Sequence, residues 1–536
     1  MRLLALALCG LILEVGWLAL SPISVALSHS PLFTAALFEA HPLLRLMPDL
    51  ARGTLPWLTE VPLAEPLGAP AYLAPAAAMA AVMLGLAAGY AAALILLQGD
   101  TGARPAALWI VVGGALLFQA TCFFLPGLFS QDVFSYIAYG RLASVYDLNP
   151  YVWPPSVVPK DAVFPWVAEV WRTYASPYGP LWVDVQAAMA RATGGLSIAD
   201  QALAYRALAN ALLAANLGLL WALLGRLTPL DRAQRTASLA ALAWNPLVLF
   251  EVAANAHNDV LMVTFTLLAF VLLARSSNAV LSSASFTLGV LVKYLSGLGL
   301  VWVYVAAAAR TTSWRSRVFR TAAMVVVSVL LVLAVAAPCL ELPASLGPLL
   351  DETAGVGYVN SIPDSVALAV ADRLSAPVEL TRTLERLLAL GSFIVYLVWE
   401  WRRVWSEATP AAVARALARS SLIYIVAVST SVQTWYYCLP VAVAVALGCR
   451  WRVTQLTLAY SVLALPALYL SYYLRDGTPL WVNLVYGLAP LVLLVPDLAA
   501  RARARPHVPA TETVGDDEQR ARRHGATPAV VEESSR

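Results

Sequence analysis

Long apolar runs are the feature that most constrains this chain. Runs of about 15 to 25 residues, the length that crosses a bilayer, give about 14 candidate spans. They lie near 3–24, 71–97, 105–125, 202–225, 236–254, 259–275, 278–294, 296–310, 320–338, 386–402, 418–432, 434–449, 454–473 and 480–499. Since 60% of the 536 residues are hydrophobic and 12% are charged, a soluble fold is not expected. The sequence predicts an all-α polytopic membrane protein with about 14 transmembrane helices, embedded in the lipid bilayer.

The two ends of the chain set the expected domain limits. The first apolar run could be read as a signal peptide, but it holds Glu14 and lacks a small-x-small cleavage site. We therefore expect an uncleaved first span. Residues 500–536 are charged and nearly free of large apolar side chains, which is typical of a disordered tail. The expected organisation is a transmembrane domain over 1–499 and a disordered cytoplasmic tail over 500–536.

Arginines indicate which way the spans run. Short arginine-rich connections occur at 225–235, 310–320, 401–420 and 449–452. The positive-inside rule places these connections, and both termini, in the cytoplasm of a multi-pass plasma-membrane protein. The long loops at 25–70, 126–201 and 339–385 then lie outside. The closely spaced runs around Lys293 and around Gln433 could each be a broken helix instead of two spans.

The loop at 126–201 contains two further helical patterns. Residues 129–146 and 180–193 have apolar periodicity but are too short or too polar to span a bilayer. We expect two juxtamembrane helices along the outer membrane face, on either side of an irregular segment rich in proline and tryptophan.

Polar interruptions gather on this same predicted outer face. Asp132 and Arg141 follow the third span, and "SPYGPLW" occupies 176–182. "NAHNDV" at 255–260 and "QTWYY" at 433–437 are outer turns, and Lys293 ends a span on that side. Because ionisable groups at membrane depth are costly, they usually face a cavity or a partner. Their convergence predicts a functional site.

Each of these features also has a purely structural alternative. Asp132 could cap its helix together with Ser130, and "HND" could be an ordinary polar turn. Lys293 could extend to lipid headgroups, and "QTWYY" could anchor the chain at the membrane interface.

An outer cavity with one acid, several cations and aromatic rings suits transfer from a lipid-linked anionic donor. A phosphate leaving group needs positive charge and hydrogen-bond donors, which Lys293, His257 and Arg141 would supply. The acceptor hydroxyl needs a general base, and Asp132 is the candidate. No nucleotide-binding motif, basic-aromatic cluster or compact acidic cluster occurs in the sequence. We therefore expect no cofactor, no metal and no nucleic-acid partner.

The order of these motifs carries a resemblance. "QDVFSYIAYGRLASVYDLNPY", then "SPYGPLW", "HNDVLMV", a lysine-terminated span and "QTWYY" resemble the GT-C membrane glycosyltransferases. The match is to the polyprenol-phosphate-mannose-dependent alpha-1,6-mannosyltransferases of actinobacteria. The resemblance implies a GT-C fold and an inverting transfer of a mannosyl or related unit from a polyprenyl-phosphate sugar to a glycan or glycolipid acceptor.

The resemblance also assigns residues. It implies that Asp132 is the base, and Tyr136, "SPYGP" and "HND" match other shared positions. Thr434 departs from the proline common in the family's "QPWY" turn. The complete candidate set is Asp132 as the catalytic residue, with Tyr136, Arg141, Tyr178, His257, Asn258, Asp259, Lys293, Gln433, Trp435 and Tyr436 binding the donor phosphate or other parts of the substrates.

A transporter or flippase of lipid-linked sugars is the alternative function. It predicts polar groups near mid-bilayer, reachable from both sides, and often an internal repeat. Here the polar groups cluster on one predicted side and no repeat is evident, which favours the enzyme.

Overall fold

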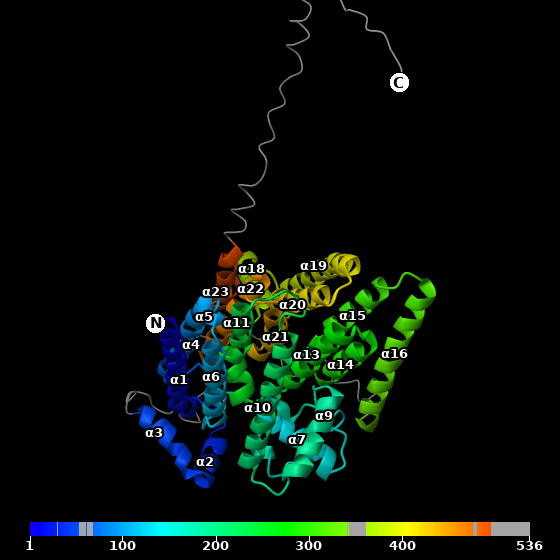
Figure 1. Ribbon diagram of the computed structural model, residues 1–536. Coiled ribbons are helices and arrows are strands. Elements are labelled where there is room, and N and C mark those ends of the chain that lie inside the picture. Colours follow the sequence, from blue (N-terminus) through cyan, green and yellow to red (C-terminus); the bar gives the residue numbers. More distant parts are fainter. Residues whose placement is uncertain are drawn as a thin grey trace, which may run out of the picture. The chain divides into compact units, whose positions relative to one another are not determined.

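A computed structural model describes residues 1–28, 30–52, 61, 68–339, 341, 361–474 and 480–494. All regular elements within these ranges are helices (Figure 1). The predicted tail at 500–536 lies outside the described residues, and so do residues 340 and 342–360 of the loop at 339–385. Chain contacts define a first compact unit, Met1–Leu491, which contains every residue discussed below.

Nine helical segments in the described part of the chain are long and apolar enough to cross a membrane. They are built on α1 (Arg2–Ala26), α4 (Leu73–Leu97), α6 (Pro105–Phe123), α10 (Ile198–Leu223), α11 (Arg232–Ala243), α13 (Asp259–Ser276), α16 (Trp314–Ala336), α20 (Pro410–Ala427) and α22 (Arg452–Leu474). Each overlaps one of the predicted spans, although α20 begins eight residues before the span expected at 418–432, and the predicted all-α polytopic membrane class is confirmed.

The other five predicted spans also fall on helices. Three coincide with the shorter apolar helices α14 (Ala279–Val292), α15 (Gly297–Ala309) and α21 (Cys438–Ala446). A fourth lies inside α19 (Val378–Glu407), whose 30 residues include charged side chains towards both ends. The last begins with α23 (Leu480–Leu488). Lys293 separates α14 from α15 with an extended backbone, and the two helices pack against each other.

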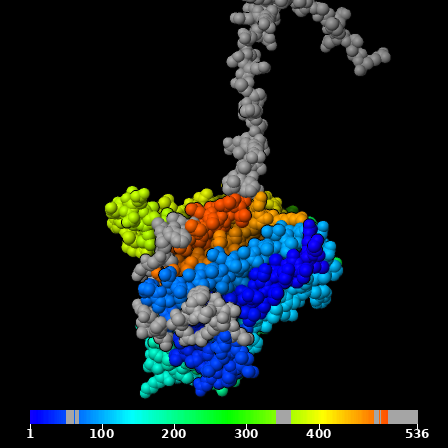
Figure 2. All heavy atoms as spheres, turned by 90° about the vertical axis from the view of Figure 1, so that its left-hand side faces the viewer, coloured from blue at the N-terminus to red at the C-terminus, as the bar shows by residue number. Residues whose placement is uncertain are grey.

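Helix α1 shows how the apolar sequence is divided between the interior and the bilayer. It packs against α4 and α6, and Leu13 and Trp17 are buried in that contact. Helix α1 lies on the face that Figure 2 shows. The helix exposes leucine and other aliphatic side chains: Leu4, Leu8, Leu11, Ile12, Val15 and Leu18. An apolar surface of this kind is stable against hydrocarbon and unfavourable against water.

Smaller helices connect the long ones. They include α2 (Pro31–Ala40), α3 (Leu46–Arg52), α5 (Asp100–Ala103), α7 (Asp132–Val145), α8 (Glu169–Arg172), α9 (Pro180–Thr193), α12 (Pro246–Val248), the π-helix η5 (Leu249–Ala254), α18 (Ile362–Leu374) and the 3-10 helix η9 (Thr434–Tyr437). Helices α7 and α9 match the two short helices expected within 126–201. Their position relative to a membrane stays a prediction.

Helices α7 and α9 pack closely because Gly140 has no side chain. A Cβ atom placed on Gly140 would lie 2.2 Å from the backbone oxygen of Gln186 in α9. Gly179, in the turn before α9, similarly lies against Leu291 and Val292 at the end of α14. These contacts bring the start of α9 next to Lys293.

A buried arginine fixes the segment that leads into α7. Arg206 of α10 donates hydrogen bonds to the backbone oxygens of Phe123, Leu125 and Gly127, at 3.0, 2.7 and 3.1 Å. It also donates to the oxygen of Ala254 at 2.6 Å. Hydrogen bonds from a charged donor are strong in a buried environment. Arg206 therefore joins the approach to α7 to the end of η5, and these two segments carry the candidate site.

Candidate active site

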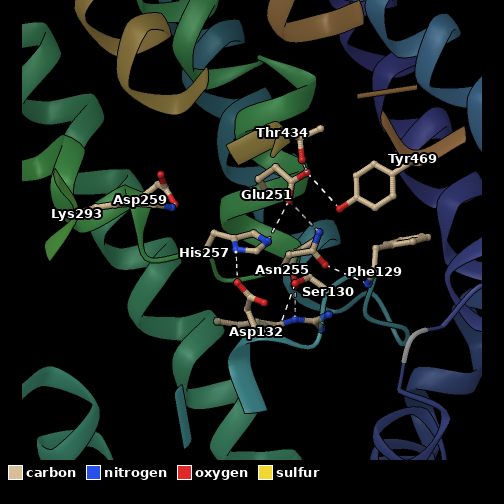
Figure 3. A network of polar contacts seen from close by, with 12 residues as sticks. Phe129, Ser130, Asp132, Glu251, Asn255, His257, Asp259, Lys293, Thr434 and Tyr469 are labelled. Atoms are coloured by element: carbon tan, nitrogen blue, oxygen red, sulfur yellow. Dashed lines mark hydrogen bonds and ion pairs between the residues drawn. The ribbon is translucent and has the colours of Figure 1, made fainter. Parts of the chain in front are cut away.

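Asp132 begins α7, and its carboxylate does not cap the helix. Ser130 Oγ accepts a hydrogen bond from the backbone nitrogen of Asp132 at 3.3 Å, and Gln131 is the N-cap residue. The Asp132 side chain, 15% exposed, points to His257, whose Nδ1 lies 3.7 Å from Asp132 Oδ2 (Figure 3). The capping alternative therefore does not account for this carboxylate.

His257 lies between two carboxylates. Its Nε2 lies 3.3 Å from Oε2 of Glu251, and both of these side chains are fully buried. The imidazole also stacks on the indole of Trp435, with ring centres 3.7 Å apart and planes at 19°. The ring is thus covered on one face by Trp435, and each of its nitrogens faces a carboxylate oxygen without a hydrogen bond among the described residues. This placement excludes the ordinary polar turn as a full explanation of "HND".

Glu251 is the centre of the network in Figure 3. It accepts hydrogen bonds from the hydroxyl groups of Thr434 and Tyr469, and from Asn255 Nδ2 at 3.3 Å. Asn255 Oδ1 in turn accepts from the backbone nitrogen of Phe129 at 3.1 Å, just before α7. The π-helix η5 and the left-handed Ala256, with φ of 61°, turn the chain so that Glu251 and His257 meet.

Lys293 forms an ion pair instead of extending freely to headgroups. Its Nζ lies 2.7 Å from Oδ2 of the fully buried Asp259. The same nitrogen lies 4.7 Å from the centre of the Tyr436 ring and 5.9 Å from that of Trp435, within cation–π range. The Lys293 side chain remains 22% exposed. An ammonium group carries three donors, so this pairing leaves others for a ligand.

Tyrosines form the side of the site nearest α9. Tyr178 donates to Asp132 Oδ2 at 3.4 Å, and its ring packs edge-on against Tyr136 with centres 5.1 Å apart. Tyr136 is fully buried, so it supports Tyr178 from behind. Burial raises the pKa of Asp132 above its ordinary value, and the charges of His257 and Lys293 oppose this shift only in part.

Arg141 does not join the site. Its guanidinium donates to both oxygens of Asp161, with a 2.9 Å contact to Oδ2, and Tyr146 donates to the same oxygen at 2.7 Å. Nine residues of α-helix make about two and a half turns, so Arg141 and Asp132 lie on opposite sides of α7. Burial opposes ionisation of Asp161, but these hydrogen bonds outweigh it and lower the pKa of Asp161. The structure therefore pairs Arg141 with Asp161 and does not bring it to Asp132, and its contact with the donor phosphate stays a prediction.

The remaining candidates lie at the edges of the site. Asn258 precedes α13, and its Nδ2 is a buried donor with no partner in the described ranges. Gln433 precedes η9, the short helix that carries Trp435 and Tyr436. In the part of the chain that the structure describes, no group of three or more His, Cys, Asp or Glu side chains is placed to hold a metal ion. The expected absence of a metal stays a prediction.

Glu251, Asn255 and Arg206 were not among the site residues predicted from the sequence. The signal for two of them was present, because Glu251 and Arg206 are single charged residues inside apolar runs, where charge is costly and usually paired. Nothing in the run at 236–254 indicated the π-helix that brings Glu251 to His257.

Comparisons with known proteins agree with the motif order. A family model described as "Alpha-(1->6)-mannopyranosyltransferase, N-terminal domain" matches residues 46–310, which include Asp132, His257 and Lys293. A "Probable alpha-(1->6)-mannopyranosyltransferase" of Mycolicibacterium smegmatis is 32% identical over 154 residues, covering 27% of this chain and 26% of that protein. "Alpha-(1->6)-mannopyranosyltransferase A" of Mycobacterium tuberculosis is 27% identical over 345 residues, covering 60% of this chain and 62% of that protein.

Each alignment spans less than two thirds of the relative's length. The resemblance to actinobacterial α-1,6-mannosyltransferases that the motifs predicted is confirmed.

Proposed function

Starting from this resemblance, we propose that the chain is an inverting glycosyltransferase. It moves a mannosyl unit from a polyprenyl-phosphate sugar to a hydroxyl group of a glycan or glycolipid. The observation that carries the proposal is the environment of Asp132, an uncapped and partly exposed carboxylate 3.7 Å from His257. Lys293 lies within cation–π range of Trp435, the ring that stacks on His257. An acid and a cation in one site suit a reaction that removes one proton and releases one anion.

Asp132 is the general base of the proposed reaction. It accepts the proton of the acceptor hydroxyl as that oxygen forms a bond to the anomeric carbon. The bond between that carbon and the phosphate oxygen breaks, and its electron pair leaves with the polyprenyl phosphate. Attack on the face opposite the phosphate inverts the configuration at the anomeric carbon.

Lys293 stabilises the leaving phosphate. The group departs as an anion and needs charge and donors rather than a proton. Lys293 is held by Asp259 at 2.7 Å and by the rings of η9, so it is fixed before the substrate arrives. Asn258 Nδ2, buried and without a partner among the described side chains, is a further donor for a substrate oxygen.

The proposed site faces the outside of the cell. The arginine-rich connections between the spans support this orientation through the positive-inside rule. The same rule supports cytoplasmic termini.

The test is Asp132→Asn in membranes supplied with labelled polyprenyl-phosphate mannose. We expect transfer to fall about 10²- to 10⁴-fold, the usual contribution of a general base, with release of free polyprenyl phosphate falling in parallel. Asp147→Asn is the matched control. It makes the same chemical change at an exposed position in the loop after α7. Full transfer by a normally expressed Asp132→Asn variant would contradict the base assignment. Movement of intact donor across the membrane without release of polyprenyl phosphate would favour the flippase.

A further inference from the structure

The unexplained feature of this site is Glu251. It is a carboxylate with no exposed surface, placed inside an apolar run at a cost that a structural role alone seldom justifies. Thr434, Tyr469 and Asn255 each donate a hydrogen bond to it. Glu251 therefore accepts at both of its carboxyl oxygens, and these contacts fix the orientation of its side chain.

The Glu251 carboxyl group faces one nitrogen of the His257 ring. Its Oε2 lies 3.3 Å from Nε2 of His257, while Nδ1 of the same ring lies 3.7 Å from Asp132 Oδ2. Trp435 covers one face of the ring. Other charged or titratable groups of the site come from each surrounding element: Asp259 of α13, Lys293 after α14, Tyr178 before α9, Tyr436 of η9 and Tyr469 of α22.

We propose that Glu251 is a positioning residue that holds the imidazole of His257 beside Asp132, so that the ring acts on the carboxylate that receives the proton of the acceptor hydroxyl. This inference rests on the proposed function. Glu251 touches no substrate in this scheme. It acts through His257, whose charge opposes the rise that burial causes in the pKa of Asp132.

The role follows from the geometry. The two nitrogens of the His257 ring face Oε2 of Glu251 on one side and Oδ2 of Asp132 on the other. Without Glu251, the ring loses its contact at Nε2 and turns on Trp435, away from Asp132. The charge of His257 then opposes the protonation of Asp132 less. A purely structural Glu251 would not produce this coupling.

The test is the pH profile of kcat/KM for Glu251→Gln. We expect the acidic limb to move to higher pH by about one unit, the lower end of the effect of a neighbouring charge on a carboxylate. His257→Gln should move the limb in the same direction. In the double variant, Glu251→Gln should add no further shift, because its effect passes through His257. Glu251→Asp is the second variant. It keeps a carboxyl group at this position, but its shorter side chain places the oxygens farther from Nε2 of His257.

Glu14→Gln is the matched control. Glu14 is also a buried acid in a span, and it accepts a hydrogen bond from Thr121 at 2.6 Å, away from His257. Its replacement should leave the profile unchanged. Equal loss of kcat/KM at every pH in both Glu251 variants, or a further shift on top of His257→Gln, would overturn the inference. Full transfer by Asp132→Asn would instead overturn the proposed function, so the two failures are distinguishable.

Discussion

At the scale of single residues, the protonation of Asp132 gives a pH prediction. Burial raises the pKa of Asp132, and a general base works only when it is ionised. The kcat/KM of the wild-type protein should therefore fall as pH decreases, with its midpoint above about 4, the ordinary value for an aspartate. The profile is measured in membranes, after a check that activity returns when each sample is brought back to neutral pH. Constant activity down to the ordinary aspartate range would contradict this prediction.

Lys293 gives a second prediction. The chain has only two lysines, so the other one, Lys160, can serve as the control. Lys293→Ala removes the charge proposed to bind the donor phosphate. A hydrogen bond to a charged group contributes about 1.5–3 kcal/mol, so kcat/KM for the donor should fall roughly 10- to 150-fold. The acceptor KM should change much less. Lys160→Ala, at the exposed other lysine, is the control and should have no effect. A larger change for the acceptor than for the donor would argue against the phosphate role.

Residue types predicted much of the site, and spacing predicted less. "HND", Lys293 and "QTWYY" interrupt apolar sequence, and this is why their clustering could be expected before the fold was known. Arg141 lies away from Asp132 because nine residues along a helix bring a side chain to the opposite face, and its contact with the donor phosphate stays a prediction. Thr434, which replaces a proline common in the family, donates to Glu251 in the structure. That contact depends on the tertiary fold and has no local signal.

At the scale of elements, the packing of α7 on α9 sets the position of Asp132. Gly140→Ala places a Cβ atom 2.2 Å from the Gln186 oxygen, so one of the two backbones must move. We expect a loss of about 1–3 kcal/mol in stability, typical of overpacking, and a loss of transfer as α7 shifts. Thermal unfolding of the purified protein in detergent measures the first effect.

Gly113→Ala is the matched control for this substitution. Gly113 lies inside α6, and a Cβ atom there would meet no atom within 4 Å. Alanine favours a helix over glycine by about 1 kcal/mol, so this variant should be as stable as the wild type or more so. An equal fall in the unfolding temperature for both variants would show that close packing at Gly140 is not the cause.

Element boundaries were predictable where local signals exist. The expected helix at 180–193 has the observed bounds because Pro180 suits a first helical turn and Gly194 follows its end. The helix expected at 129–146 is shorter, Asp132–Val145, because Ser130 and Gln131 form its start. The π-helix Leu249–Ala254 had no such signal in an apolar run.

At the scale of the whole molecule, apolar content was enough to predict the membrane class, because bilayer thickness fixes the length of a spanning helix. Apolar content was less informative about which helices cross the bilayer. Helices α14, α15 and α21 are short for a bilayer, and their contacts with neighbouring helices are non-local in sequence. The predicted orientation of the protein in the membrane rests on the arginine-rich connections alone, and it can be tested directly.

Cysteine labelling tests the orientation with one pair of sites. Lys160→Cys lies in the loop between α7 and α9, and Ser313→Cys lies in the turn before α16; both positions are exposed. If the site faces outward, a membrane-impermeant maleimide should label Lys160→Cys in intact cells and Ser313→Cys only after permeabilisation. The wild-type protein provides the baseline, because four of its five cysteines are buried and Cys9 is partly so. The reverse pattern would place Asp132 on the cytoplasmic side, where the proposed donor would have to present its sugar to the cytoplasm.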